Sequence, residues 1–112
     1  MIDLSSKSAV VTGAGQGVGL GIATALAKHG AKVALLGRTF DKVYKASKKL
    51  NKDGLKTIAI ECDVKHEESI DLAIAQIISE FTTINVLINN AQEVPLGSVL
   101  EISEEDFVSG WE

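Results

Sequence analysis

Thr12-Gly13-Ala14-Gly15-Gln16-Gly17-Val18-Gly19 is the stretch that decides the fold of this chain, and it follows directly on the apolar run Ala9-Val10-Val11. Glycine at a turn allows backbone angles that a side chain forbids, and it lets the main chain approach a phosphate closely. A helix that starts here offers unpaired N–H groups and a partial positive charge to an anion. We therefore expect a dinucleotide pyrophosphate to lie against the turn at Gly13 and the N–H groups of Gly15, Gln16, Gly17 and Val18. Gly19 is expected to let the helix pack on the sheet; the alternative is a glycine turn with a purely steric role.

Strand and helix patterns alternate along the rest of the chain. Apolar runs predict strands at Ser8–Thr12, 32–36, 57–60 and 85–88. Helical spacing predicts helices at 18–29, from an N-cap at Thr39 to about residue 51, and at Glu67–Phe81. The second helix is expected to bury Val43, Ala46 and Leu50, and a fourth helix is expected to open at Ser103. Continuous apolar strands between amphipathic helices predict an α/β fold, a Rossmann-type doubly wound parallel sheet with strand order 3-2-1-4.

The composition indicates one folded unit over residues 1–112 and argues against several classes of function. The chain is 46% hydrophobic with a net charge of −4, whereas nucleic-acid binding needs a concentrated basic face. Its single cysteine, Cys62, forms no internal disulfide, which favours a reducing compartment. Neither a signal peptide nor an apolar run of membrane-spanning length is recognisable, so a cytoplasmic location is expected. His29 and His66 stand apart from other ligand residues, so no metal site is expected.

Two further motifs follow later strands. Asp63-Val64 comes at the end of the third predicted strand, and Asn89-Asn90-Ala91 at the end of the fourth. With the glycine spacing of the first turn, they make the chain resemble the N-terminal half of the short-chain dehydrogenase/reductase family over essentially all its residues. All three motifs lie at the carboxyl ends of strands, where open α/β sheets bind ligands.

The resemblance also assigns roles to these residues. It implies that the Asp63 carboxylate binds the adenine amino group and that the Val64 N–H meets a ring nitrogen. It implies that Asn90 and Ala91 border the ribose on the nicotinamide side. The alternatives are an Asp that caps a turn before the next helix and two asparagines that only form a turn. Gln92 stands where the family usually has glycine, which leaves the shape of that loop open.

The choice of cofactor is expected to be made at the end of the second strand. An acidic residue there would hold the ribose 2′-hydroxyl of NAD and repel a 2′-phosphate. This chain has Gly37-Arg38-Thr39 instead, and a guanidinium with a neighbouring hydroxyl suits a phosphate. Lys42 adds a second positive charge nearby. NADP is therefore favoured over NAD, although Gln16 stands where many NADP-preferring relatives carry a basic residue.

The resemblance implies an NADP(H)-preferring oxidoreductase that transfers hydride between nicotinamide and a small-molecule carbonyl or secondary alcohol. The family's catalytic Ser, Tyr and Lys would lie beyond Glu112, so no catalytic residue is assigned, and the Tyr44/Lys48 spacing is interpreted as a chance match. We expect the unit to be incomplete, to leave residues 86–88 as an open strand edge, and to form a homo-oligomer in the full-length form. The alternatives are a non-catalytic dinucleotide-binding or sensor module, and a degenerate truncated product without function.

Overall fold

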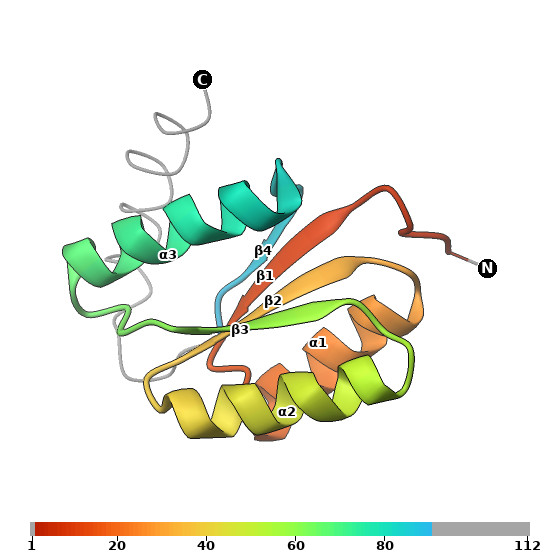
Figure 1. Cartoon of the computed structure of the whole chain (residues 1–112), viewed down its shortest axis with the longest axis horizontal. Helices are drawn as coiled ribbons and strands as arrows, with labels where there is room; N and C mark the ends of the chain where they lie inside the picture. The colour runs from red at the N-terminus through yellow and green to blue at the C-terminus, as the bar shows by residue number, and fades with distance from the viewer. Residues whose placement is uncertain (1, 91–112) are drawn as a thin grey trace.

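The computed structural model describes residues 2–90, which form four strands and three helices (Figure 1). The strands are β1 (Ser8–Thr12), β2 (Lys32–Gly37), β3 (Thr57–Glu61) and β4 (Val86–Ile88). The helices are α1 (Gly17–Lys28), α2 (Phe40–Lys52) and α3 (Glu67–Phe81). All strand pairs are parallel, and the order β3-β2-β1-β4 confirms the predicted doubly wound sheet. The predicted fourth helix at Ser103 lies outside the described residues.

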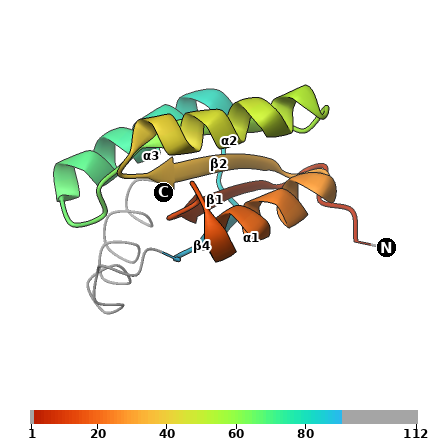
Figure 2. The same ribbon diagram turned by 90° about the horizontal axis from the view of Figure 1, so that it is seen from below.

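The sheet buries both of its faces under helices. Alternate side chains of a strand point to opposite faces, so Val10 and Leu36 pack with α3, whereas Val11 and Leu35 pack with α1 and α2. The three layers are seen in Figure 1, and Figure 2 shows α1 and α2 from their own side of the sheet. This double cover explains why the strands read as apolar runs rather than as alternating patterns. Because all the strands are parallel, their carboxyl ends lie at one edge of the sheet.

Helix α2 is joined to β3 by a buried polar cluster that periodicity did not predict. We expected Ala46 to be buried, but Ala46 is only half-buried, and Ser47 is buried in its place. The Ser47 and Thr57 hydroxyls are 2.6 Å apart, and the Thr57 hydroxyl also donates to the Asn51 Oδ1 at 2.9 Å. The Thr57 N–H donates to the same Oδ1 at 2.8 Å. Because each polar atom has a partner, the buried serine is tolerated.

The substitution Thr57→Val should therefore lower the free energy of unfolding by about 2 kcal/mol, because it keeps the shape of the side chain and removes hydrogen bonds from the buried Ser47 hydroxyl and from the exposed Asn51. Urea denaturation of the full chain measures the change. Thr83→Val is the matched control at an exposed position and should change stability by less than about 0.5 kcal/mol. Equal effects of the two substitutions would show that the cluster does not contribute to stability.

Candidate functional site

A cavity of about 360 Å³ opens where the carboxyl ends of the strands meet the first turns of α1 and α2. The predicted residues that line it are Gly13, Gly15, Gln16, Gly17, Val18, Arg38, Thr39, Asp63, Val64 and Asn90. The remaining walls come from Thr12, Leu36, Gly37, Lys42, Val43, Cys62 and Lys65. Ala91 lies outside the described residues, and Gly19 is not part of the wall. Motifs that are far apart in sequence thus meet in one place.

The glycine-rich turn between β1 and α1, here called the glycine loop, has the backbone that its sequence requires. Gly13 and Gly17 both have a φ of 60°, a region that side chains disfavour. Apart from its own chain neighbours and the backbone of α1, no described atom lies within 4 Å of the place where a Cβ on Gly17 would stand, so the main chain there is open to a ligand. Helix α1 begins at Gly17, its N-cap Gln16 makes no side-chain capping hydrogen bond, and its first turn has no acidic residue. The N-terminus of α1 therefore presents its backbone donors to the cavity without a capping side chain.

Gly19 holds the loop against the sheet. A Cβ at this position would stand 2.2 Å from the Gly13 carbonyl oxygen and 2.6 Å from the Asn90 Nδ2. The Asn90 Nδ2 itself donates to the Gly13 carbonyl at 3.4 Å. Only a residue without a side chain fits between these groups. Gly19 therefore contributes to the site through packing, from behind the cavity wall.

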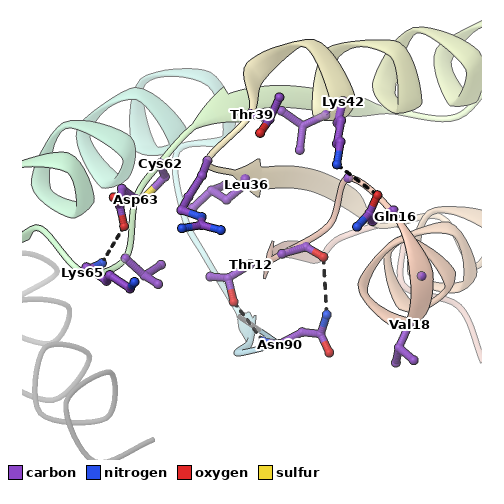
Figure 3. A pocket seen from close by; sticks show the side chains of 17 residues that line it. Thr12, Gln16, Val18, Leu36, Thr39, Lys42, Cys62, Asp63, Lys65 and Asn90 are labelled. Atoms are coloured by element: carbon purple, nitrogen blue, oxygen red, sulfur yellow. Dashed lines mark hydrogen bonds between the residues drawn. The ribbon is translucent and has the colours of Figure 1, made fainter. Parts of the chain in front are cut away.

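Thr12 links the ends of β1 and β4, a role that the sequence motifs did not predict. Its hydroxyl donates to the Asn89 Oδ1 at 3.3 Å. The same hydroxyl accepts the Asn90 N–H at 2.9 Å, as Figure 3 shows. The two asparagines therefore do more than form a turn, because they fix the glycine loop to the neighbouring strand. The only signal in the sequence was a threonine directly before the first glycine, which by itself does not identify its partner.

Arg38 and Thr39 extend from the end of β2 into the cavity wall, and both are exposed. Thr39 is the N-cap of α2 by position, but its side chain makes no capping hydrogen bond. Gly37 allows the helix to come close, since a Cβ there would stand 2.9 Å from the Val43 Cγ1. Asp41, the nearest acidic residue of α2, forms an ion pair with Lys45 at 3.0 Å and is not part of the wall. The β2 end of the cavity is therefore positively charged.

Asp63 is the one carboxylate on the cavity wall among residues 2–90. Its Oδ1 accepts the Lys65 N–H at 3.0 Å, and its Oδ2 lies 3.6 Å from the His66 Nε2. Asp63 thus caps the turn before α3, as the alternative interpretation predicted, and it also lines the cavity. Val64 beside it is buried and lines the same wall. Its neighbour Cys62 is also buried, and this burial raises the pKa of the Cys62 thiol, with a smaller raising effect from Asp63 and an opposing hydrogen bond from Ser69.

Tyr44 and Lys48, the pair at Tyr-x-x-x-Lys spacing, lie away from the cavity. Tyr44 lies on the exposed side of α2, stacked on Phe40 with 5.5 Å between ring centroids, and neither Tyr44 nor Lys48 lines the wall. Within residues 2–90 there is no cluster of three or more metal-ligating side chains and no helix long and apolar enough to cross a membrane. What the cavity offers is glycine backbone, a helix N-terminus, two strand-end turns and a cationic corner. These groups fit an extended anionic ligand.

Three known proteins show what this chain resembles in sequence and in fold. Oxidoreductase UcpA of Salmonella typhimurium is 39% identical over 103 residues, which are 92% of this chain and 39% of that protein. L-Sorbose reductase from Gluconobacter frateurii, solved with NADPH and L-sorbose, superposes with a TM-score of 0.85 at 26% identity over 98% of this chain and 49% of its own. A putative D-mannonate oxidoreductase from Haemophilus influenza with bound NAD gives a TM-score of 0.74 at 32% identity over 77% of this chain and 31% of its own.

This chain spans less than half the length of each of these three proteins. The model of the short chain dehydrogenase family matches residues 7–110, which is nearly the whole chain. The match includes the glycine loop and both later motifs. The chain therefore belongs to the short-chain dehydrogenase/reductase family.

Proposed function

We propose that this chain is the cofactor-binding part of an NADP(H)-preferring oxidoreductase that acts on a small-molecule carbonyl or secondary alcohol. The observation that carries the proposal is the corner at the end of β2, where Arg38 and Thr39 line the cavity and the neighbouring Asp41 is turned to Lys45. A guanidinium with a hydroxyl beside it binds a 2′-phosphate well, whereas an acid at this strand end would select NAD. One related structure holds NADPH and another holds NAD, so the preference must come from this chain's own residues.

The other predicted residues bind the parts that both cofactors share. The backbone N–H groups at the start of α1, from Gly17 onward, would bind the pyrophosphate, and the Thr12 and Asn90 hydrogen bonds keep the loop in position for it. Asp63 and Val64 would hold the adenine ring, and Asn90 with Ala91 would border the second ribose. The bound nicotinamide would supply or accept a hydride. Fixing the dinucleotide at several points is what orients its reactive ring.

The test is a fluorescence titration of the full chain with NADPH and NADH, together with an assay of hydride transfer to carbonyl compounds by the full-length protein, which would carry the catalytic residues expected beyond Glu112. We expect NADPH to bind on the order of tenfold more tightly or better, because one charge-assisted contact to the phosphate contributes about 1.5–3 kcal/mol. Equal affinity for both would contradict the cofactor preference. Tight NADPH binding without any hydride transfer would favour the non-catalytic nucleotide-binding module, and binding of neither would favour a product without function.

The same proposal includes a cytoplasmic location and a homo-oligomeric full-length protein, both on the precedent of the family. A reducing compartment suits the free Cys62 thiol. Fractionation of cells and light scattering of the full-length protein test these two points. Recovery in an oxidising compartment, or a monomer at micromolar concentration, would contradict them.

A further inference from the structure

Gln16 and Lys42 meet across the rim of the cavity. Lys42 lies in the first turn of α2 and Gln16 is the N-cap of α1, and the Lys42 Nζ donates to the Gln16 Oε1 at 3.2 Å (Figure 3). The residues are 26 positions apart, and both are exposed. The contact depends on Gly15, because a Cβ there would stand only 3.0 Å from the Lys42 Cβ. The glycine loop and α2 are thus packed closely enough for the two side chains to pair.

The pairing determines what these two side chains offer to a ligand. An ammonium has three donors and no acceptor, so it can bind Gln16 only through the amide oxygen. That contact fixes the orientation of the amide, and its NH₂ group cannot face the ammonium. One acceptor is used within the pair, while two ammonium hydrogens and the amide NH₂ remain as donors. The pair therefore presents donors and one positive charge, which suits an anion with several oxygens.

The pair lies near the end of β2, where Arg38 and Thr39 line the cavity. The Lys42 N–H donates to the Thr39 carbonyl at 3.1 Å, so Lys42 is one helical turn from Thr39, which follows the end of β2 by two residues. Lys42 and Gln16 line the same cavity as Arg38 and Thr39. Asp63, the carboxylate of the described wall, belongs instead to the end of β3. Two cations, Arg38 and Lys42, thus line the cavity on the side of β2 and α2, where the 2′-phosphate of the proposed cofactor would lie.

We infer that Gln16 positions Lys42 as a second cationic ligand, beside Arg38, for the 2′-phosphate of NADP(H). The inference rests on the proposed function and deepens it. It also changes the interpretation of Gln16, whose lack of charge stood against NADP in the sequence. The charge at this rim comes from α2, and Gln16 holds it in place. Gln16 is a positioning residue, and Lys42 is the residue that contacts the phosphate.

The first experiment substitutes Lys42→Met in the full chain and measures dissociation constants for NADPH and NADH by fluorescence titration. NADPH should bind on the order of tenfold more weakly, because a charge-assisted contact to the phosphate is lost, and NADH should change by less than about twofold. Lys49→Met is the matched control: it removes the same charge from the same helix, about 10 Å further along the axis and outside the cavity wall. It should leave both constants within about twofold, because exposed charges at that distance are screened.

The second experiment separates the positioning role of Gln16 from a structural one. Gln16→Met should weaken NADPH binding about threefold in the unsubstituted chain and cause no further loss once Lys42 is Met, because its effect acts through Lys42. Gln16→Arg in the Lys42→Met background should restore most of the lost NADPH affinity, since it returns a cation to the same rim. A purely structural role for Gln16 would give additive losses, and NADH binding would fall with NADPH binding.

Several results would overturn the inference. Equal losses for NADPH and NADH in Lys42→Met would place Lys42 at the part that both nucleotides share. An equal loss of NADPH affinity in Lys49→Met would indicate that the positive charge of α2 as a whole, rather than Lys42, attracts the nucleotide. A chain that prefers NADPH but is unaffected by Lys42→Met would retain the proposed function and refute the inference alone. A chain without NADPH preference would refute both.

Discussion

Gly19→Ala is expected to lower the free energy of unfolding by about 3 kcal/mol, because overpacking against fixed backbone has no cheap relief. The new Cβ would stand 2.2 Å from the Gly13 carbonyl oxygen, closer than any real contact of this kind, so the glycine loop or α1 must move. The shifted loop is the one that would hold the pyrophosphate. NADPH and NADH should therefore lose affinity to the same degree. Urea denaturation and nucleotide titration of the full chain measure the two effects.

Gly21→Ala is the matched control in the same helix. A Cβ on Gly21 would meet no described atom within 4 Å, and the position is exposed. Alanine is the better helix former, so this substitution should raise stability by about 0.5–1 kcal/mol and leave nucleotide binding unchanged. The two glycines are two positions apart, yet the expected effects have opposite signs. Similar effects at both positions would show that helix propensity, rather than contact with the loop, determines the need for glycine.

The fold was predictable because it depends on patterns that are local in the chain. Glu67–Phe81 and Ser8–Thr12 were predicted at the bounds that the structure gives, and the strand order followed from the general handedness of parallel connections. The errors arose where a buried residue was polar. Periodicity favoured Ala46 over Ser47 as a core residue, because the partners of Ser47 lie on β3 and are not visible in the spacing of α2.

The candidate site was predictable residue by residue but not in its contacts. The motifs at the ends of β1, β3 and β4 located the cavity, because carboxyl ends of parallel strands share one edge. The hydrogen bonds between Thr12 and Asn90 and between Gln16 and Lys42 join elements that only the sheet register brings together. Sequence spacing contains no such register. From spacing alone, Lys42 favoured NADP and Gln16 argued against it, whereas the structure joins the two side chains in one hydrogen-bonded pair.

Arg38→Asp should reverse the preference between the two cofactors. Arg38 lines the cavity from the end of β2 and is exposed, so a carboxylate there can be accommodated without disturbing the core. The substitution removes a charge-assisted contact to the 2′-phosphate and puts a negative charge beside it. We expect NADPH to bind on the order of 100-fold more weakly. NADH should bind as well as before or better, because the new carboxylate can accept the ribose 2′-hydroxyl.

Two comparison variants distinguish this local effect from a general change in charge. Lys56→Asp makes the same change in net charge at an exposed position just before β3, at the opposite end of the sheet, and should leave both affinities within about twofold. Arg38→Met removes the attraction without adding repulsion, so its loss of NADPH affinity should lie between those of the unsubstituted chain and Arg38→Asp. Titrations with both nucleotides at two salt concentrations should show that the NADPH difference shrinks as salt rises. Equal losses for NADPH and NADH in Arg38→Asp would mean that Arg38 binds the shared part of the dinucleotide, and the assigned preference for NADP would then be wrong.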